Sequence, residues 1–165
     1  MMKSKKGFTL LELLVAAAII GMLAVFATIS YRSSQIETEM AHAKGRTRVL
    51  AGAVQRFRLE YPRPEHFSGI VLDRSAVSNA CQPNNANLDQ LFNCQLLENG
   101  GWTSEFVEYY VCNGKTGDCG TSPINDPLAC MKGKDHPRMP DQYRTSEGFI
   151  YCVSATDARD NNLGR

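Results

Sequence analysis

Near its start the chain reads Lys5-Lys6-Gly7-Phe8-Thr9-Leu10-Leu11-Glu12-Leu13-Leu14, a basic stretch followed directly by an apolar one. From Phe8 to Tyr31 the only charged side chain is Glu12, and most of the others are aliphatic. Such a run is long enough to span a bilayer as an α-helix. We therefore predict a membrane-spanning helix over residues 8–31.

The residues before the apolar run predict its orientation. Three lysines and no acidic residue precede it, and basic residues favour the cytoplasmic side of a membrane. Everything after Tyr31 is then expected outside the cytoplasm. A secretory signal has its cleavage site after its apolar core, whereas the Gly7-Phe8 junction lies before it. A cut at this junction would leave the membrane segment at the new N-terminus.

The run Gly7-Phe8-Thr9-Leu10-Leu11-Glu12 resembles the signature of the type IV pilin family, which includes the pseudopilins of type II secretion. That signature is a basic leader ending in glycine, then Phe-Thr, two apolar residues and glutamate, and the chain carries it without a departure. The resemblance implies that a prepilin peptidase cuts after Gly7 and removes the leader, residues 1–7. It also implies that Phe8 becomes the N-terminal residue and that its amine is methylated.

The resemblance further implies where the chain resides and what assembles it. The precursor would be a single-pass protein of the bacterial inner membrane, with a cytoplasmic N-terminus and a periplasmic head. An inner-membrane assembly platform and an ATPase would then polymerise it into an extracellular homo-oligomeric helical filament. The helix of residues 8–31 would form the core of that filament.

Glu12 is costly in a membrane helix unless it is paired, because the bilayer does not solvate charge. The Phe8 amine is the partner that we expect, within one subunit or in a neighbouring one. Pairing between subunits would favour correct axial stagger, since a slipped neighbour would leave a buried carboxylate unpaired. The alternative is that Glu12 only snorkels to the lipid headgroups of a plain membrane anchor.

An apolar stripe predicts that the helix continues beyond Tyr31. Its members advance by alternating steps of four and three residues, which is the spacing of one helical face: Ile36, Met40, Ala43, Thr47, Leu50, Val54, Phe57 and Tyr61. Charged residues lie off this stripe, and Tyr61-Pro62-Arg63-Pro64 is typical of a helix end. We predict an amphipathic continuation over residues 32–61 that packs its stripe on a globular domain.

Glycines are the weak points of this helix. Most pilins have a proline in its first half, but no proline occurs between Met1 and Tyr61 in this chain. Gly21, Gly45 and Gly52 remain, and Gly21 is predicted to be the centre of any local melting in a filament. Close helix packing at Gly21 is the alternative.

Residues 62–165 are predicted to form the globular head. Strands are expected at Glu105–Cys112 and Gly148–Val153, where aromatic and β-branched residues gather. Residues 88–97 favour a helical or irregular structure, and residues 122–144 favour a loop because Pro, Gly, Asp and Lys are frequent there. The expected fold class is α+β: a long N-terminal helix packed against a small antiparallel sheet of three or four strands, with a disulfide-stabilised, loop-rich C-terminal region.

All six cysteines lie in the head, at Cys81, Cys94, Cys112, Cys119, Cys130 and Cys152. Disulfides are expected in a domain outside the cytoplasm. A zinc site would need close Cys-x-x-Cys pairs with matching histidines, and none occurs, so no metal is expected. We favour sequential pairing because the first two pairs close short loops and the third ties a long loop to the last strand. Pairing of Cys112 with Cys152 is the alternative.

The sequence contains no motif of an enzyme or of a cofactor site. It has no Gly-rich phosphate loop or nucleophile elbow, and its three histidines are scattered. The formal net charge of +1 does not indicate a general nucleic-acid binder. Contact with DNA or an anionic surface is a minor hypothesis, based on the loop residues Lys132, Lys134, Arg138 and Arg144.

The function expected from the sequence is therefore structural. We expect a subunit of a type IV pilus that serves adhesion, twitching motility or DNA uptake. The alternative is a minor pilin or a pseudopilin of a type II secretion machine. Retention of Glu12 argues against tip-type minor subunits, and six cysteines favour a pilus over a pseudopilin.

Overall fold

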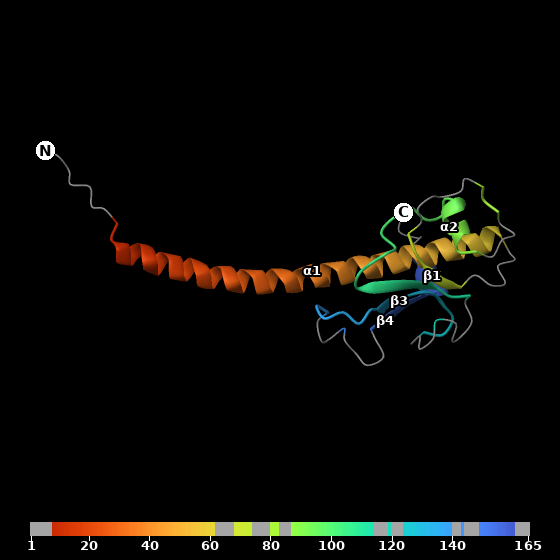
Figure 1. Cartoon of the computed structure of the whole chain (residues 1–165). Coiled ribbons are helices and arrows are strands. Elements are labelled where there is room, and N and C mark those ends of the chain that lie inside the picture. The colour runs from red at the N-terminus through yellow and green to blue at the C-terminus, as the bar shows by residue number, and fades with distance from the viewer. Residues whose placement is uncertain are drawn as a thin grey trace. The chain divides into compact units, whose positions relative to one another are not determined.

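The computed structural model describes residues 8–61, 68–73, 80–82, 87–113, 119, 124–139, 143 and 149–160. The chain divides into two compact units, Met1–Thr38 and Glu39–Arg165, and each is described by itself. Helix α1 (Leu10–Glu60) contributes to both units, and all the strands belong to the second (Figure 1). The predicted end of the helix near Tyr61 agrees with this range, whereas Pro62 and Pro64 lie outside the described residues.

The predicted apolar stripe of α1 is the buried face of the helix. Six of its members are 3% exposed or less: Met40, Ala43, Thr47, Leu50, Val54 and Phe57. Thr47 is tolerated among them because its hydroxyl donates a hydrogen bond to the carbonyl of Ala43, 2.9 Å away. Leu50 and Val54 are fully buried, so this face of the helix forms one side of the core of the second unit.

The sheet is antiparallel and has four strands in the order β1-β2-β3-β4. These are β1 (Gly69–Val71), β2 (Val107–Val111), β3 (Pro127–Gly133) and β4 (Ile150–Ser154). Two short helices, α2 (Asp89–Asn93) and α3 (Ala155–Asp160), complete the unit. The predicted fold class, a long N-terminal helix with a small antiparallel sheet and disulfides in the C-terminal region, is confirmed.

The prediction that residues 122–144 form a loop is wrong, because β3 lies within them. Leu128, Ala129, Cys130 and Met131 are each 2% exposed or less, and β3 is a central strand that pairs with β2 and β4. A strand buried on both faces has no polar alternation to reveal it. Its flanking Pro, Lys and Gly residues favoured a loop instead. Strand β1 was not predicted either, because it has only three residues.

Side chains from α1 hold the helix on the sheet within the second unit. Arg58 donates a hydrogen bond of 2.6 Å to the carbonyl of Cys112, just after β2. Arg48 donates one of 3.1 Å to the hydroxyl of Tyr151 in β4. The ammonium group of Lys44 lies 5.8 Å from the centroid of the same Tyr151 ring. These contacts tie the helix to the end of β2 and to the edge strand β4.

The carboxylate of Asp73, just after β1, organises the loop before β2. It accepts hydrogen bonds from the backbone N–H groups of Trp102 at 2.7 Å and Thr103 at 2.9 Å. Burial alone would raise the pKa of Asp73, but these donors, with others nearby, lower it. Trp102 is 5% exposed and meets the ring of Tyr109 edge to face, with centroids 5.5 Å apart. The loop is thereby fixed over the first half of β2.

Candidate assembly site

The first turn of α1 is closed by a reciprocal pair of residues, Thr9 and Glu12. The backbone N–H and the hydroxyl of Thr9 each donate a hydrogen bond of 2.9 Å to the same oxygen of the Glu12 carboxylate. In return, the backbone N–H of Glu12 donates one of 3.3 Å to the Thr9 hydroxyl. This is the capping box, in which Thr and Glu three residues apart satisfy the free donors of a helix start.

The capping box gives Glu12 a partner within its own subunit, which the sequence reasoning overlooked. The signal was present as Thr-x-x-Glu directly before an apolar run. The cost of an unpaired charge in the bilayer had favoured the Phe8 amine as the partner instead. Phe8 itself is 85% exposed, and Gly7, the other half of the predicted cleavage site, lies outside the described residues.

The segment after the capping box carries no other charge. Leu10–Thr28 has 19 residues and a mean hydropathy of 2.6, and none of it is buried within the chain. Among the described residues, this is the one helical segment that is long and apolar enough to cross a membrane. Large apolar side chains such as Leu10, Ile20 and Phe26 are each more than 60% exposed. A surface of this kind must be covered by lipid or by other chains.

Gly21 lies within this apolar segment, where α1 continues without interruption. A Cβ atom added at Gly21 would meet nothing within 4 Å in the chain itself. The same holds for Gly45 and Gly52 farther along the helix. Gly21 therefore leaves a gap on the helix surface that is unfilled within one chain. Its predicted role in local melting and the alternative of close helix packing both stay predictions.

All six cysteines are paired, as Cys81–Cys94, Cys112–Cys119 and Cys130–Cys152. This is the sequential pairing favoured from the sequence. The sulfur atoms of Cys112, Cys119 and Cys130 lie within 4.8 Å of one another, so two of the disulfides are neighbours in the core. Because these sulfurs are bonded to each other in pairs, they are not free thiolates for a metal ion.

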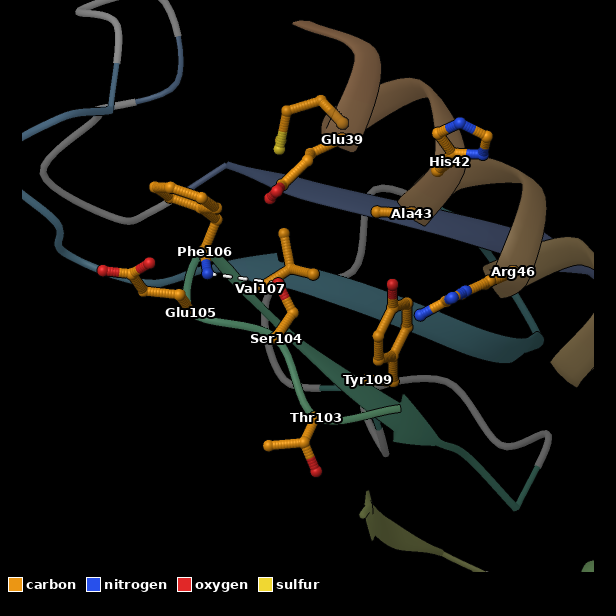
Figure 2. A pocket seen from close by; sticks show the side chains of 11 residues that line it. Glu39, His42, Ala43, Arg46, Thr103, Ser104, Glu105, Phe106, Val107 and Tyr109 are labelled. Carbon is orange, nitrogen blue, oxygen red and sulfur yellow. Dashed lines mark hydrogen bonds between the residues drawn. The ribbon is translucent and has the colours of Figure 1, made fainter. Parts of the chain in front are cut away.

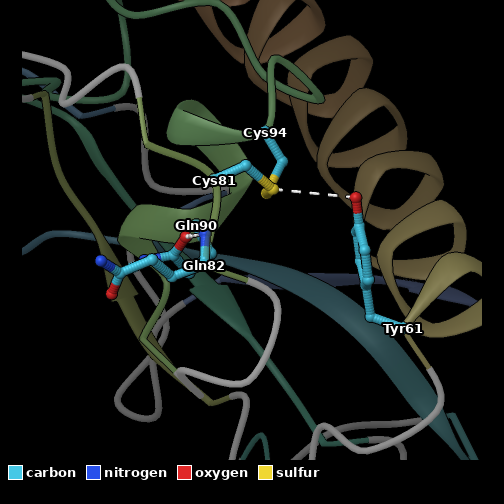
Figure 3. The surroundings of a disulfide bond; sticks show 5 residues. All are labelled: Tyr61, Cys81, Gln82, Gln90 and Cys94. Atoms are coloured by element: carbon cyan, nitrogen blue, oxygen red, sulfur yellow. Dashed lines mark hydrogen bonds between the residues drawn. A yellow bond between two sulfur atoms is a disulfide. The ribbon is translucent and has the colours of Figure 1, made fainter.

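The Cys81–Cys94 disulfide joins the described segment 80–82 to the end of α2 (Figure 3). The hydroxyl of Tyr61, at the end of α1, lies 3.7 Å from the Cys81 sulfur. The buried side chain of Gln90 accepts a hydrogen bond of 2.8 Å from the backbone N–H of Gln82. This disulfide is therefore packed between the end of α1 and helix α2.

The basic residues proposed for DNA contact do not form a free cluster. Lys134 donates a hydrogen bond of 2.7 Å to the carbonyl of Ser104, and Arg138 forms an ion pair of 2.9 Å with Glu105. Lys132 is exposed on β3, and Arg144 lies outside the described residues. Two of the four cations thus already have partners within the head, which weakens the case for a nucleic-acid surface.

The two histidines that the structure describes, His42 and His136, lie on different elements. The Nε2 atom of His136 lies 2.8 Å from a carboxylate oxygen of Glu105, and the His136 ring meets the ring of Phe106 edge to face. His42 is exposed on α1, and His66 lies outside the described residues. The acidic pair of Glu37 and Glu39 is exposed on the helix.

Comparison with known proteins identifies the N-terminal segment. Residues 2–28 match the family model of the prokaryotic N-terminal methylation motif. No curated protein and no solved structure matches the chain. The match covers the basic stretch, the Thr9–Glu12 capping box and the apolar segment together. The chain therefore carries the N-terminal methylation motif that is the signal of type IV pilins and pseudopilins, which implies processing by prepilin peptidase and assembly into a pilus-like filament.

Proposed function

We propose that the chain is a structural subunit of a type IV pilus. The observation that carries this proposal is that the methylation motif includes an exposed apolar helical segment, Leu10–Thr28, which is long enough to cross a bilayer. Lipid covers this helix in the precursor, and the helices of other subunits cover it in the filament. The same surface serves storage and assembly, because both surroundings are apolar.

The chain is divided by this proposal into four functional segments. Residues 1–7 are the leader, and prepilin peptidase removes it between Gly7 and Phe8. Residues 8–31 are the membrane and filament-core helix, and residues 32–61 are its amphipathic continuation. Residues 62–165 are the head, which lies in the periplasm before assembly and on the outer surface of the filament afterwards. The inner-membrane assembly platform and its ATPase extract the subunit from the membrane.

The capping box refines the proposed role of Glu12. In the precursor the carboxylate is held by Thr9, so it enters the membrane with hydrogen bonds that an isolated charge would lack. Cleavage creates a positive amine at Phe8, four residues before Glu12. The amine of a neighbouring subunit is then a stronger, charged donor for the same carboxylate. Assembly thus adds a charged partner to a carboxylate that its own subunit already orients.

The test is to shear cells that express the chain and to identify the filaments released. An abundant extracellular fibre that contains the chain supports a pilus subunit. Absence of such a fibre, together with a protein-secretion defect when the chain is deleted, would instead indicate a pseudopilin. Absence of the fibre with loss of a fibre made from another subunit would indicate a minor pilin.

Glu12→Ala tests the assembly step, with Glu37→Ala as the matched control. Both replace an acidic side chain of α1, but Glu37 lies beyond the apolar segment. Glu12→Ala is expected to give an inserted, cleaved and folded protein with strongly reduced filaments, whereas Glu37→Ala should assemble normally. Normal filaments from Glu12→Ala would mean that the carboxylate has no role in assembly and only snorkels to the headgroups.

A further inference from the structure

The second compact unit contains a groove of about 440 Å³ between α1 and the segment that leads into β2 (Figure 2). Helix α1 contributes Glu39, His42 and Arg46 to its wall, and Tyr109 of β2 lies at one end. All of these residues belong to the second compact unit, Glu39–Arg165. Its volume is in the range of sites that bind small molecules.

Tyr109 offers a hydrogen-bond donor that no group in the described chain accepts. The residue is 2% exposed, its hydroxyl is directed into the groove, and it makes no hydrogen bond to the part of the chain that the structure describes. Burial raises the pKa of Tyr109, although the charge of Arg46 opposes the shift, so the phenol keeps its proton at neutral pH. The hydroxyl is therefore a neutral hydrogen-bond donor in the wall of the groove, where an acceptor of a bound ligand can meet it.

Arg46 supplies a positive charge beside that hydroxyl. Its side chain extends from α1 toward Tyr109, and it has no ion pair among the described residues (Figure 2). The guanidinium lies against Gly101, where a Cβ atom would overlap it. Gly101 also has a φ of +79°, which glycine adopts without strain. The loop before β2 therefore leaves room for the arginine at this end of the groove.

Glu39 makes the opposite end of the groove acidic. Its carboxylate points into the groove in Figure 2, and it lies seven residues before Arg46 on the same helix. Two helical turns separate these residues by about 10 Å along the axis, which is room for a six-membered ring with a hydrogen bond at each end. A second negative charge on the ligand would meet Glu39, so phosphates, dicarboxylates and nucleic acids are disfavoured.

We propose that this groove binds a sugar acid with one carboxylate, of the hexuronic acid class. Arg46 and Tyr109 donate hydrogen bonds to the carboxylate. Because the acceptor is charged, these hydrogen bonds are stronger than those between neutral groups. Glu39 accepts hydrogen bonds from the hydroxyl groups of the ring. The site lies entirely within the second compact unit and does not depend on the assembly function proposed above.

The chain contains its own reporter for this binding. Trp102 is the single tryptophan of the chain, and the centroid of its ring lies 5.5 Å from that of Tyr109. The full chain in detergent micelles is titrated with galacturonate while tryptophan fluorescence is recorded, and galactose and sulfate are titrated in parallel. Galacturonate should give a saturable change. Galactose lacks the carboxylate and sulfate lacks the ring, so each should bind at least about tenfold more weakly.

Two variants and a control locate the site. Arg46→Gln should weaken galacturonate binding about tenfold or more, and Tyr109→Phe about fivefold, because one charged and one neutral donor are lost. Arg56→Gln, at an exposed arginine of α1 outside the groove, should bind like the parent chain. Arg46 is exposed, so its variant is expected to fold even if Tyr109→Phe does not.

Several outcomes would overturn the proposal. One is no saturable response to galacturonate in the folded parent chain, and another is equal affinity for galactose. A third is equal loss of affinity in the Arg46 and Arg56 variants, which would indicate general attraction between charges. Because the titration uses unassembled protein in micelles, none of these results depends on whether the chain forms filaments.

Discussion

The three disulfides should stabilise the head to different extents, and the order follows from the structure. Cys130–Cys152 spans 22 residues, Cys81–Cys94 spans 13 and Cys112–Cys119 spans 7. Cross-linking removes more entropy from the unfolded chain when the closed loop is longer. The chain-entropy relation gives stabilisations of ~3.4, ~2.9 and ~2.4 kcal/mol in the same order.

Burial increases the expected difference in stabilisation between the disulfide that closes the longest loop and the one that closes the shortest. Cys130 and Cys152 face each other directly across the β3–β4 register, and both are at most 4% exposed. Cys112 is fully buried, but its partner Cys119 is only half-buried. Replacing Cys130 and Cys152 by alanine therefore removes packing from two core positions, whereas replacing Cys112 and Cys119 removes it from one.

The assay is urea unfolding of the full chain in detergent micelles, followed by the fluorescence of the single tryptophan, Trp102. Trp102 is buried in the head, so it reports on unfolding of that unit. The Cys130→Ala/Cys152→Ala chain should lose about 1 kcal/mol more than the Cys112→Ala/Cys119→Ala chain. Equal or reversed losses would refute the reasoning, because neither loop length nor burial would then determine the contribution of each bridge.

Three further predictions concern the head. The hydrogen bond to Glu108 raises the pKa of Tyr110 from 10.0 to about 12. The free energy of unfolding should therefore fall as the pH rises from 10 to 12 in the parent chain and fall less in Tyr110→Phe, as measured by urea midpoints. The pKa of Asp73 is lowered from 3.8, so its contribution is present above that pH and is lost as the pH falls below it; Asp73→Asn should flatten this acid dependence. Gly101→Ala should destabilise the head by about 1 kcal/mol or more because its φ is positive, whereas Gly45→Ala, on an open helical surface, should be neutral or stabilising in thermal melts.

The long helix was predictable because residues that are neighbours in the sequence determine both of its halves. The apolar segment follows from composition alone, and the stripe from Met40 to Phe57 follows from the helical period. Strand β2 was also predictable, because its residues Val107–Val111 are almost all β-branched or aromatic. In each case neighbouring residues along the chain carry the whole signal, so no contact with a distant segment is needed to recognise the element.

The missed features depend on partners that are distant in sequence. Strand β3 is buried because β2 and β4 flank it, and nothing within Pro127–Gly133 reveals those neighbours. The groove arises because Arg46 and Tyr109, which are 63 residues apart in the numbering, meet at the loop fixed by Asp73. The Thr9–Glu12 capping box is the exception, because its spacing was visible and only its meaning was overlooked.

The most direct test of the account is the mass of the mature N-terminus. The chain is expressed in cells that have a prepilin peptidase, purified from their membranes, and analysed by mass spectrometry of the intact protein and its N-terminal peptide. The account predicts a chain that begins at Phe8 and carries a methyl group on its amine. A chain that still begins with Met1 in such cells would contradict it and would leave a plain membrane anchor.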